Sequence, residues 1–73
     1  MAEGLRNMLR ELRAERDLTQ AALAELVGVS RKTINTIENG VFVPSTLLAL
    51  KLAQALGLKV EDLFSLDNHE VEK

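Results

Sequence analysis

The segment QAALAELVGVSRKTINTIENG, residues 20–40, decides how this chain folds. Its first part predicts a helix, because Leu23, Leu26 and Val27 share one face at the spacing i, i+3, i+4. Gly28 ends that helix, since glycine adopts a left-handed backbone without a Cβ clash. The segment therefore begins with a short amphipathic helix and a tight turn.

The second part of the segment predicts another helix. Ser30 is a suitable N-cap, Ile34 and Ile37 face inward at i, i+3, and Asn39-Gly40 is a stop signal. Ala24 is small where two steeply crossed helices must approach each other. The outward side chains of the second helix are Arg31, Lys32, Thr33, Asn35 and Thr36. Two such helices joined by a tight turn form a helix-turn-helix, whose second helix enters the DNA major groove.

The residues before this segment predict one more helix. Apolar side chains follow the spacing i, i+3, i+4, i+7 from Leu5 through Met8 and Leu9 to Leu12. We expect this helix to end at Asp17, because aspartate tolerates the left-handed conformation better than most residues. Thr19 is then the N-cap of the following helix.

The residues after the segment predict two further helices. Val41-Phe42-Val43 forms a short bridge; a hairpin at Asn39-Gly40 is rejected because the preceding residues have helical spacing. A helix capped by Ser45 ends at Gly57, and a short helix follows over residues 60–64. The inner face of the longer helix consists of Leu47, Leu48, Ala49, Leu52, Ala53 and Leu56.

Composition limits the class of protein. The 73 residues suffice for one domain, and the absence of cysteine excludes disulfides and thiolate metal sites. The chain is 47% hydrophobic with only two phenylalanines, so we expect an aliphatic core. Without a membrane-spanning run or a signal peptide, a soluble cytoplasmic protein is predicted.

The net charge of −2 is unevenly distributed. Residues 1–59 carry eight Lys/Arg against six Asp/Glu, whereas residues 60–73 carry one against five. A mildly basic body with an acidic end is compatible with DNA binding, because local charge decides it. Strong non-specific binding is not expected from so few cations.

Two segments carry a family resemblance: LTQAALAELVGVSRKTINTIENG, residues 18–40, and PSTLLALKLAQALG, residues 44–57. With these segments the chain resembles the small Cro/C1-type (XRE-family) helix-turn-helix regulators of prokaryotes and phages, over roughly residues 5–64. The resemblance implies an all-α fold, the compact five-helix bundle of lambda-repressor-like DNA-binding domains, over residues 1–66. Residues 67–73 would form an acidic, flexible tail.

The DNA contacts follow from the helix and from the resemblance. The N-terminal side chains of a helix in the major groove meet base edges, and arginine can bond guanine O6 and N7 together. The resemblance implies that Arg31, Lys32 and Thr36 read bases, with Asn35 a secondary candidate. Backbone contacts are expected from Gln20, Ser30, Thr33 and Asn39. The alternative is an ordinary solvated helix face.

The resemblance also implies a partly buried ion pair between Arg13 and Glu38, which would link the first helix to the recognition helix. The loop departs from the family pattern. Val41 and Val43 stand where relatives often have polar or basic residues, so this loop would contact the DNA backbone less, with Phe42 either packed inward or exposed.

A homodimer is expected, since one recognition helix reads too few base pairs to single out a site in a genome. We expect the dimer patch to comprise Leu58, Val60, Leu63 and Phe64; the alternative for each residue is that it caps the core. The predicted function is a sequence-specific DNA-binding transcriptional regulator, a repressor that binds a palindromic operator. The alternative is an antitoxin, with a toxin as partner, or an adaptor that uses this fold for protein–protein contacts.

An enzyme is not predicted. The one histidine, His69, lies in the tail, no serine has a base at a recognisable spacing, and no glycine-rich phosphate loop occurs. Asp67, His69, Glu70 and Glu72 could ligate a metal only loosely, and tails of this composition are usually solvated. No cofactor and no metal site are therefore expected.

Overall fold

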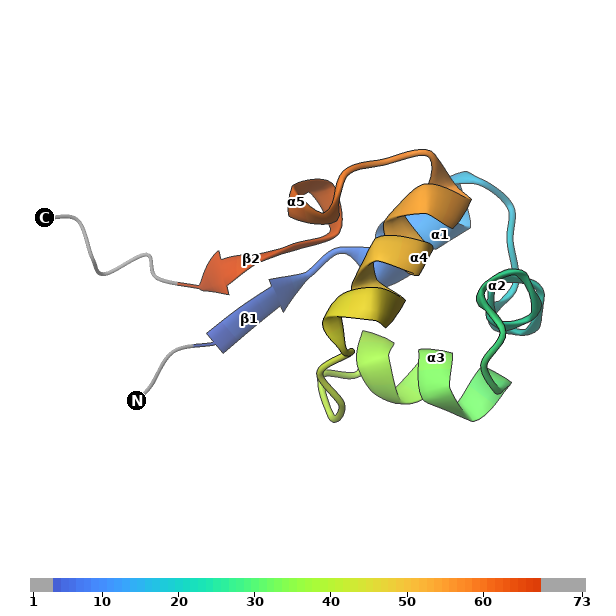
Figure 1. Cartoon of the computed structure of the whole chain (residues 1–73), viewed down its shortest axis with the longest axis horizontal. Coiled ribbons are helices and arrows are strands. Elements are labelled where there is room, and N and C mark those ends of the chain that lie inside the picture. Colours follow the sequence, from blue (N-terminus) through green and yellow to red (C-terminus); the bar gives the residue numbers. More distant parts are fainter. Residues whose placement is uncertain (1–3, 68–73) are drawn as a thin grey trace, which may run out of the picture.

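The computed structural model describes residues 4–67. Its elements are, in chain order, β1 (Gly4–Asn7), α1 (Leu9–Glu15), α2 (Gln20–Val27), α3 (Arg31–Glu38), α4 (Thr46–Leu56), α5 (Val60–Leu63) and β2 (Phe64–Asp67) (Figure 1). The five helices pack together, and the two strands extend from one side of them.

The helix-turn-helix predicted from the sequence is present as α2 and α3. The Thr19 Oγ1 atom accepts a hydrogen bond from the Ala22 N–H at 2.9 Å, so this residue caps α2. Gly28 has φ 78° and ends the helix. The Ser30 Oγ atom accepts from the Thr33 N–H at 3.2 Å and caps α3. These local signals set both helix ends where the sequence predicts them.

The hydrophobic core lies between the helices. α2 contacts both α3 and α4, and α1 contacts α3. The buried hydrophobic side chains are Leu9, Leu23, Ala24, Val27, Ile34, Ile37, Leu48, Leu52, Ala53, Leu56 and Leu63. The core is aliphatic, as expected from the composition.

Two leucines assigned to inner helix faces are exposed instead. Leu26 on α2 is 61% exposed and Leu47 on α4 is 64% exposed. Each lies at the margin of the apolar stripe of its helix, one position before a buried residue, Val27 or Leu48. The stripe that packs is therefore narrower than the stripe that the sequence pattern suggests.

The prediction of a helix from Leu5 is wrong for its first residues, and the fold is not purely α-helical. β1 pairs antiparallel with β2, with Leu5 opposite Leu66 and Asn7 opposite Phe64. Where β1 leads into α1, the Asn7 Oδ1 atom accepts a hydrogen bond from the Leu9 N–H at 2.9 Å. The pairing joins residues at opposite ends of the chain, which helical periodicity cannot reveal.

The C-terminal end differs from the sequence prediction in the same way. Phe64 begins β2 rather than ending α5. Asp67, which the sequence assigned to the tail, pairs with Gly4 in the sheet. The rest of the proposed tail, residues 68–73, lies outside the described residues.

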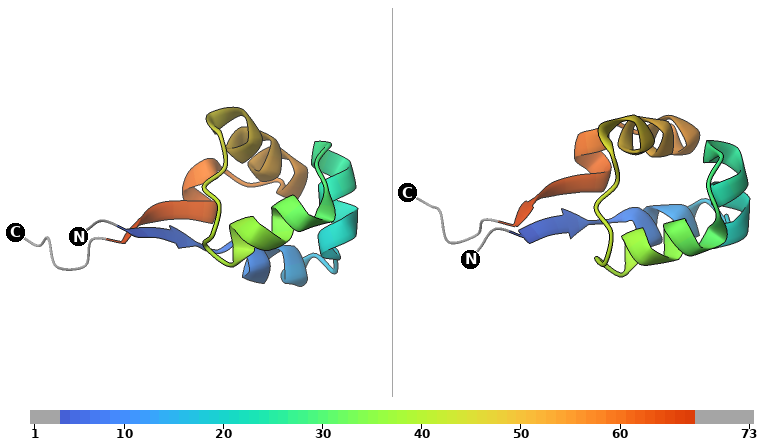
Figure 2. Two further views of the ribbon diagram at one scale, coloured as in Figure 1. Left: turned by 90° about the horizontal axis from the view of Figure 1, so that it is seen from below. Right: turned by 60° about the horizontal axis from the view of Figure 1, so that its bottom comes forward.

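The segment after α3 is not a strand, which agrees with the rejection of a hairpin at Asn39-Gly40. It runs as a loop from Gly40 to the N-cap of α4, and Ser45 Oγ accepts a hydrogen bond from the Leu48 N–H at 3.1 Å (Figure 2). α4 ends at Gly57, where the Leu58 N–H donates to the Ala53 carbonyl at 2.8 Å. Among residues 4–67, no helix has the length and hydropathy that crossing a bilayer requires.

The turn inside the helix-turn-helix gives a first testable prediction. Gly28→Ala adds a methyl group that meets no atom within 4 Å, but at φ +78° the Cβ strains the backbone. We expect a loss of about 1–2 kcal/mol in the free energy of unfolding, measured by urea denaturation. Gly4→Ala is the control, since Gly4 lies in strand β1, where an extended backbone accommodates a Cβ atom, and equal stabilities of the two variants would contradict the prediction.

Candidate nucleic-acid interface

The first turn of α3 presents two cations to solvent. Arg31 and Lys32 directly follow the Ser30 cap, and both are exposed. Neither side chain forms a hydrogen bond or ion pair with any other residue between 4 and 67. Both are therefore available to a ligand, as expected of groups that read base edges or bind phosphates.

The hydroxyl groups along this side of α3 are engaged within the protein. Ser30 Oγ and Thr33 Oγ1 lie 3.0 Å apart and share a hydrogen bond. The Thr36 Oγ1 atom donates to the Thr33 carbonyl at 2.9 Å. These three residues were predicted as DNA contacts. The Ser30 hydroxyl caps the start of α3, and the Thr36 hydroxyl is bonded within the helix.

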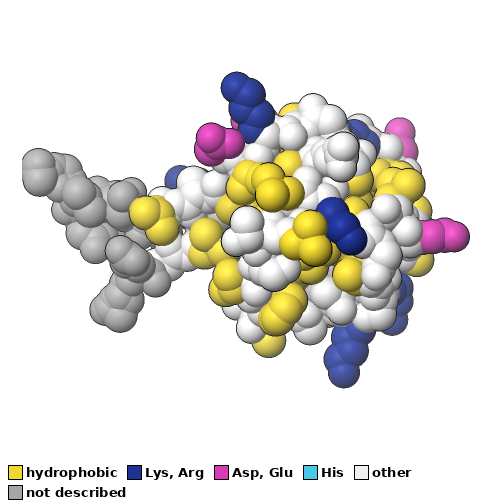
Figure 3. Space-filling model, viewed as in Figure 1, with side chains coloured by type: hydrophobic (Ala, Val, Ile, Leu, Met, Phe, Trp, Pro, Cys, Tyr) yellow, Lys and Arg dark blue, Asp and Glu magenta, His cyan; other side chains and the backbone are white. Residues whose placement is uncertain are grey.

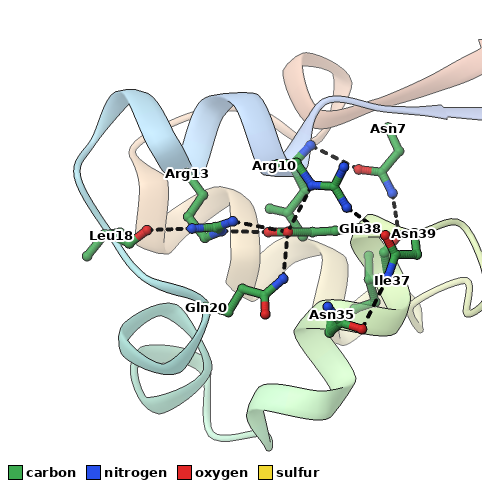
Figure 4. A network of polar contacts seen from close by, with 10 residues as sticks. Asn7, Arg10, Arg13, Leu18, Gln20, Asn35, Ile37, Glu38 and Asn39 are labelled. Carbon is green, nitrogen blue, oxygen red and sulfur yellow. Dashed lines mark hydrogen bonds and ion pairs between the residues drawn. The ribbon is translucent and has the colours of Figure 1, made fainter.

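The C-terminal end of α3 is held by the carboxylate of Glu38, whose side chain is 0% exposed. Arg13 Nε donates to Glu38 Oε2 at 2.6 Å, and Arg13 Nη2 donates to Oε1 at 3.1 Å. The same guanidinium donates to the Leu18 carbonyl at 2.7 Å (Figure 4). The pair implied by the resemblance is thus a bidentate contact between α1 and α3. The Arg13 guanidinium also holds Leu18, which follows the turn at the end of α1.

Gln20 and Arg10 complete the surroundings of the same carboxylate. Gln20 Nε2 donates to Glu38 Oε1 at 2.9 Å, which joins the first residue of α2 to the last residue of α3. Arg10 Nε lies 3.5 Å from Glu38 Oε1, although its side chain is 54% exposed. Gln20 was predicted as a phosphate contact, and its amide nitrogen already has this internal partner.

Asn39 and Asn35 belong to the same network (Figure 4). Arg10 Nη2 donates to Asn39 Oδ1 at 2.6 Å, and Asn39 Nδ2 lies 3.2 Å from Asn35 Oδ1. Asn7 adds a bond from its Nδ2 atom to the Ile37 carbonyl at 2.6 Å. The helix-turn-helix is therefore attached to α1 and β1 at several points.

The sequence interpretation missed Arg10 and Asn7 in this network. Arg10 lies three residues before Arg13 on the same helix, so the i, i+3 spacing places both beside Glu38. That spacing is a signal in the sequence. The contact of Asn7 with Ile37 spans 30 positions and has no local signal.

The network changes the acid–base properties of its two central groups. Burial alone would raise the pKa of Glu38, but hydrogen bonds from Arg13 and Gln20 and the nearby arginine charges lower it below its ordinary value of 4.5. The hydrogen bonds to Glu38 raise the pKa of Arg13. Both groups are charged at neutral pH, so they form a partly buried ion pair.

The four residues expected in a dimer patch differ in their exposure to solvent. Leu63 is 0% exposed and belongs to the core, so it offers no surface to a partner and is withdrawn from the patch. Leu58, Val60 and Phe64 are partly buried and pack against that core. Val60 and Phe64 also line an open groove of about 540 Å³, together with Leu5, Val43, Pro44, Thr46, Ala49, Leu50 and Glu61.

A metal site was not expected from the sequence. Within residues 4–67, no three His, Cys, Asp or Glu side chains gather to hold an ion. His69, Glu70 and Glu72 lie outside the described residues.

Comparison with known proteins gives consistent matches. The helix-turn-helix family model matches residues 9–63. An uncharacterized HTH-type transcriptional regulator of Bacillus subtilis, YgzD, is 48% identical over 63 residues, covering 86% of this chain and 96% of the relative.

Two solved structures share the fold. The restriction-modification controller protein C.AhdI from Aeromonas hydrophila is 41% identical with a TM-score of 0.73, covering 77% of this chain and 85% of that protein. The P22 c2 repressor in complex with a synthetic operator is 32% identical with a TM-score of 0.70, covering 73% of this chain and 80% of that protein.

The buried carboxylate gives a prediction for stability. We expect Glu38→Gln to lower the free energy of unfolding at pH 7 by about 3 kcal/mol, because it leaves Arg13 with an uncompensated charge. Since the folded state lowers the pKa of Glu38, the wild type gains this stability above pH 4.5 and loses it as the pH falls through the folded-state pKa. The difference between the proteins should therefore shrink in acid.

Urea denaturation at pH 7 and pH 3 measures both effects. Glu25→Gln, which alters an exposed carboxylate on α2, is the control and should change little at either pH. A Glu38→Gln protein as stable as wild type at pH 7 would contradict the prediction.

Proposed function

This chain belongs to the helix-turn-helix family of transcriptional regulators, and on that premise we propose that it is a sequence-specific repressor that binds a palindromic operator as a homodimer. The observation that carries the proposal is the pair of free cations, Arg31 and Lys32, on the first turn of α3. A recognition helix meets base edges with these N-terminal side chains.

The internal network supports this assignment because it fixes the recognition helix before DNA arrives. Glu38 at the end of α3 bonds to α1 through Arg13 and to α2 through Gln20. A preorganised surface loses less conformational entropy on binding. In this assignment Arg31 reads a guanine through its forked guanidinium, and Lys32 contacts a neighbouring base or phosphate.

The contacts that we propose with the DNA backbone differ in part from those expected from the sequence. Arg10 is exposed beside Asn39, at the end of α3 opposite to Arg31, and we assign it to a phosphate. Gln20 and Asn39 serve chiefly to position α3. Ser30 and Thr33 can still approach the DNA backbone, because the hydroxyl that accepts their shared hydrogen bond keeps its own hydrogen to donate to a phosphate oxygen.

The homodimer requires an exposed surface, and the apolar groove beside α4 fits that requirement. Leu5 and Leu50 in its lining are 42% and 54% exposed, and Val60 and Phe64 form part of its wall. Hydrophobic side chains are spread over the face of the molecule that carries α4 (Figure 3). A second copy of the chain would cover them, and the pair would present two recognition helices to two half-sites.

Repression by occlusion accords with the kind of proteins that share this fold. The P22 protein is a repressor in complex with an operator. A dimer that covers its operator blocks other proteins from the same DNA. The antitoxin or adaptor alternative uses the same fold. Binding measurements that show no sequence preference for DNA would favour this alternative.

Substitution of Arg31 tests the base contact. We expect Arg31→Ala to weaken binding to the DNA upstream of the protein's own gene by about 10- to 100-fold and to reduce the preference over random DNA. Fluorescence anisotropy across a salt series measures both. Lys51→Ala, an exposed cation on α4, is the matched control and should change neither. A wild-type protein without sequence preference at moderate salt would refute the proposed function.

Substitution of Leu50 tests the dimer. Leu50→Glu places a charge in the groove and should shift the protein towards the monomer, because an unpaired charge disfavours an apolar interface. Leu47→Glu changes another exposed leucine of the same helix, which does not line the groove, and should leave the oligomeric state unchanged. Sedimentation equilibrium distinguishes the two, and a monomeric wild type would refute the homodimer.

A further inference from the structure

A second depression lies between α3 and the loop that follows it. It measures about 330 Å³ and is lined by Ser30, Lys32, Thr33, Thr36, Val41 and Phe42. It therefore adjoins the side chains proposed to read DNA, and the following inference rests on the proposed function.

The hydroxyl groups of the threonines that line this depression are hydrogen-bonded within the protein. Thr36 Oγ1 donates to the Thr33 carbonyl, and Thr33 Oγ1 pairs with Ser30 Oγ. Besides the remaining capacity of its hydroxyl group, each threonine offers a ligand its γ-methyl group. A helix face that looks polar in the sequence is therefore partly apolar in its chemistry.

Backbone hydrogen bonds hold the loop beside these threonines. The N–H groups of Val41 and Phe42 both donate to the Thr36 carbonyl, at 2.9 and 3.2 Å. In Figure 2 the loop leaves the C-terminal end of α3 and turns up towards α4. The bonds fix the loop, yet Val41 and Phe42 remain 77% and 46% exposed. Their apolar side chains thus form a fixed wall that the protein itself does not cover.

We propose that Thr36, Val41 and Phe42 form a pocket for the C5-methyl group of a thymine in the operator. Thymine is the one base that presents an apolar group in the major groove, and threonine methyl and phenylalanine contacts suit it. Lys32 at the rim supplies a cation for the phosphate backbone beside that base. The loop that lacks polar and basic residues thus gains a role in sequence recognition.

The test removes single methyl groups from the DNA. Duplexes that the wild-type protein selects from a random-sequence library are resynthesised with deoxyuridine in place of one thymine at a time. Their dissociation constants are measured by fluorescence anisotropy. Uracil keeps every hydrogen-bonding group of thymine and lacks only the methyl, so we expect about fourfold weaker wild-type binding at the position that fills the pocket.

Two variants locate the pocket in the protein. Phe42→Ala removes the wall, whereas Thr36→Ser removes one methyl and keeps the hydroxyl that donates to Thr33. Each should bring the ratio of uracil to thymine dissociation constants at that position close to one. Leu26→Ala, at an exposed leucine on α2, should keep the wild-type ratio. Because both duplexes meet the same protein, a small change in stability cancels from the ratio.

The outcomes separate this inference from the proposed function. If uracil at every position leaves the dissociation constant of a selected duplex unchanged, the pocket is overturned. The proposal of a sequence-specific regulator then still stands. An effect of uracil that persists in both variants places the methyl contact elsewhere and also overturns the pocket. A wild-type protein that selects no sequence refutes the proposed function, and the pocket with it.

Discussion

The carboxylate of Glu38 is the constraint on which the geometry of this small domain depends. It lies at the C-terminal end of a helix, where the helix dipole disfavours a negative charge, and its side chain is fully buried. Such a group is tolerable only when donors surround it, and Arg13 and Gln20 supply three hydrogen bonds from two other helices. The need to satisfy one buried charge therefore fixes the mutual orientation of α1, α2 and α3.

A consequence for DNA recognition is a division of roles between the two ends of α3. At its C-terminal end, polar groups bond to one another, so that Asn35 and Asn39 act as parts of the framework. At its N-terminal end, Arg31 and Lys32 have no internal partners among the described residues. The residues of α3 that were predicted to contact DNA thus differ in the free energy that such a contact costs. A side chain already bonded within the protein must break that hydrogen bond to contact DNA, whereas an exposed cation exchanges only its bonds to water.

The sequence predicts those parts of the structure that local chemistry determines. Helix ends follow from single residues such as Thr19, Gly28 and Ser30, whose caps and left-handed backbone need only near neighbours. The β1–β2 pair could not be predicted, because strand pairing between residues 4–7 and 64–67 leaves no local periodicity. The candidate site shows the same limit. Residue types and spacing identify the cations of α3, but the internal bonds that occupy Thr36 become visible only in three dimensions.

The domain has little positive charge to offer DNA. Residues 4–67 contain eight Lys/Arg against eight Asp/Glu, and one of these cations, Arg13, is paired with Glu38. A protein with few free cations gains little affinity from phosphates, and its binding depends less on salt than that of a strongly basic domain. In the proposed repressor, affinity would come from base edges, from apolar contacts and from the pairing of two domains on one operator. The exposed apolar residues beside α3 and along α4 suit such contacts. The small number of cations would also keep non-specific binding weak, so that the ratio of specific to non-specific affinity could be high without tight binding.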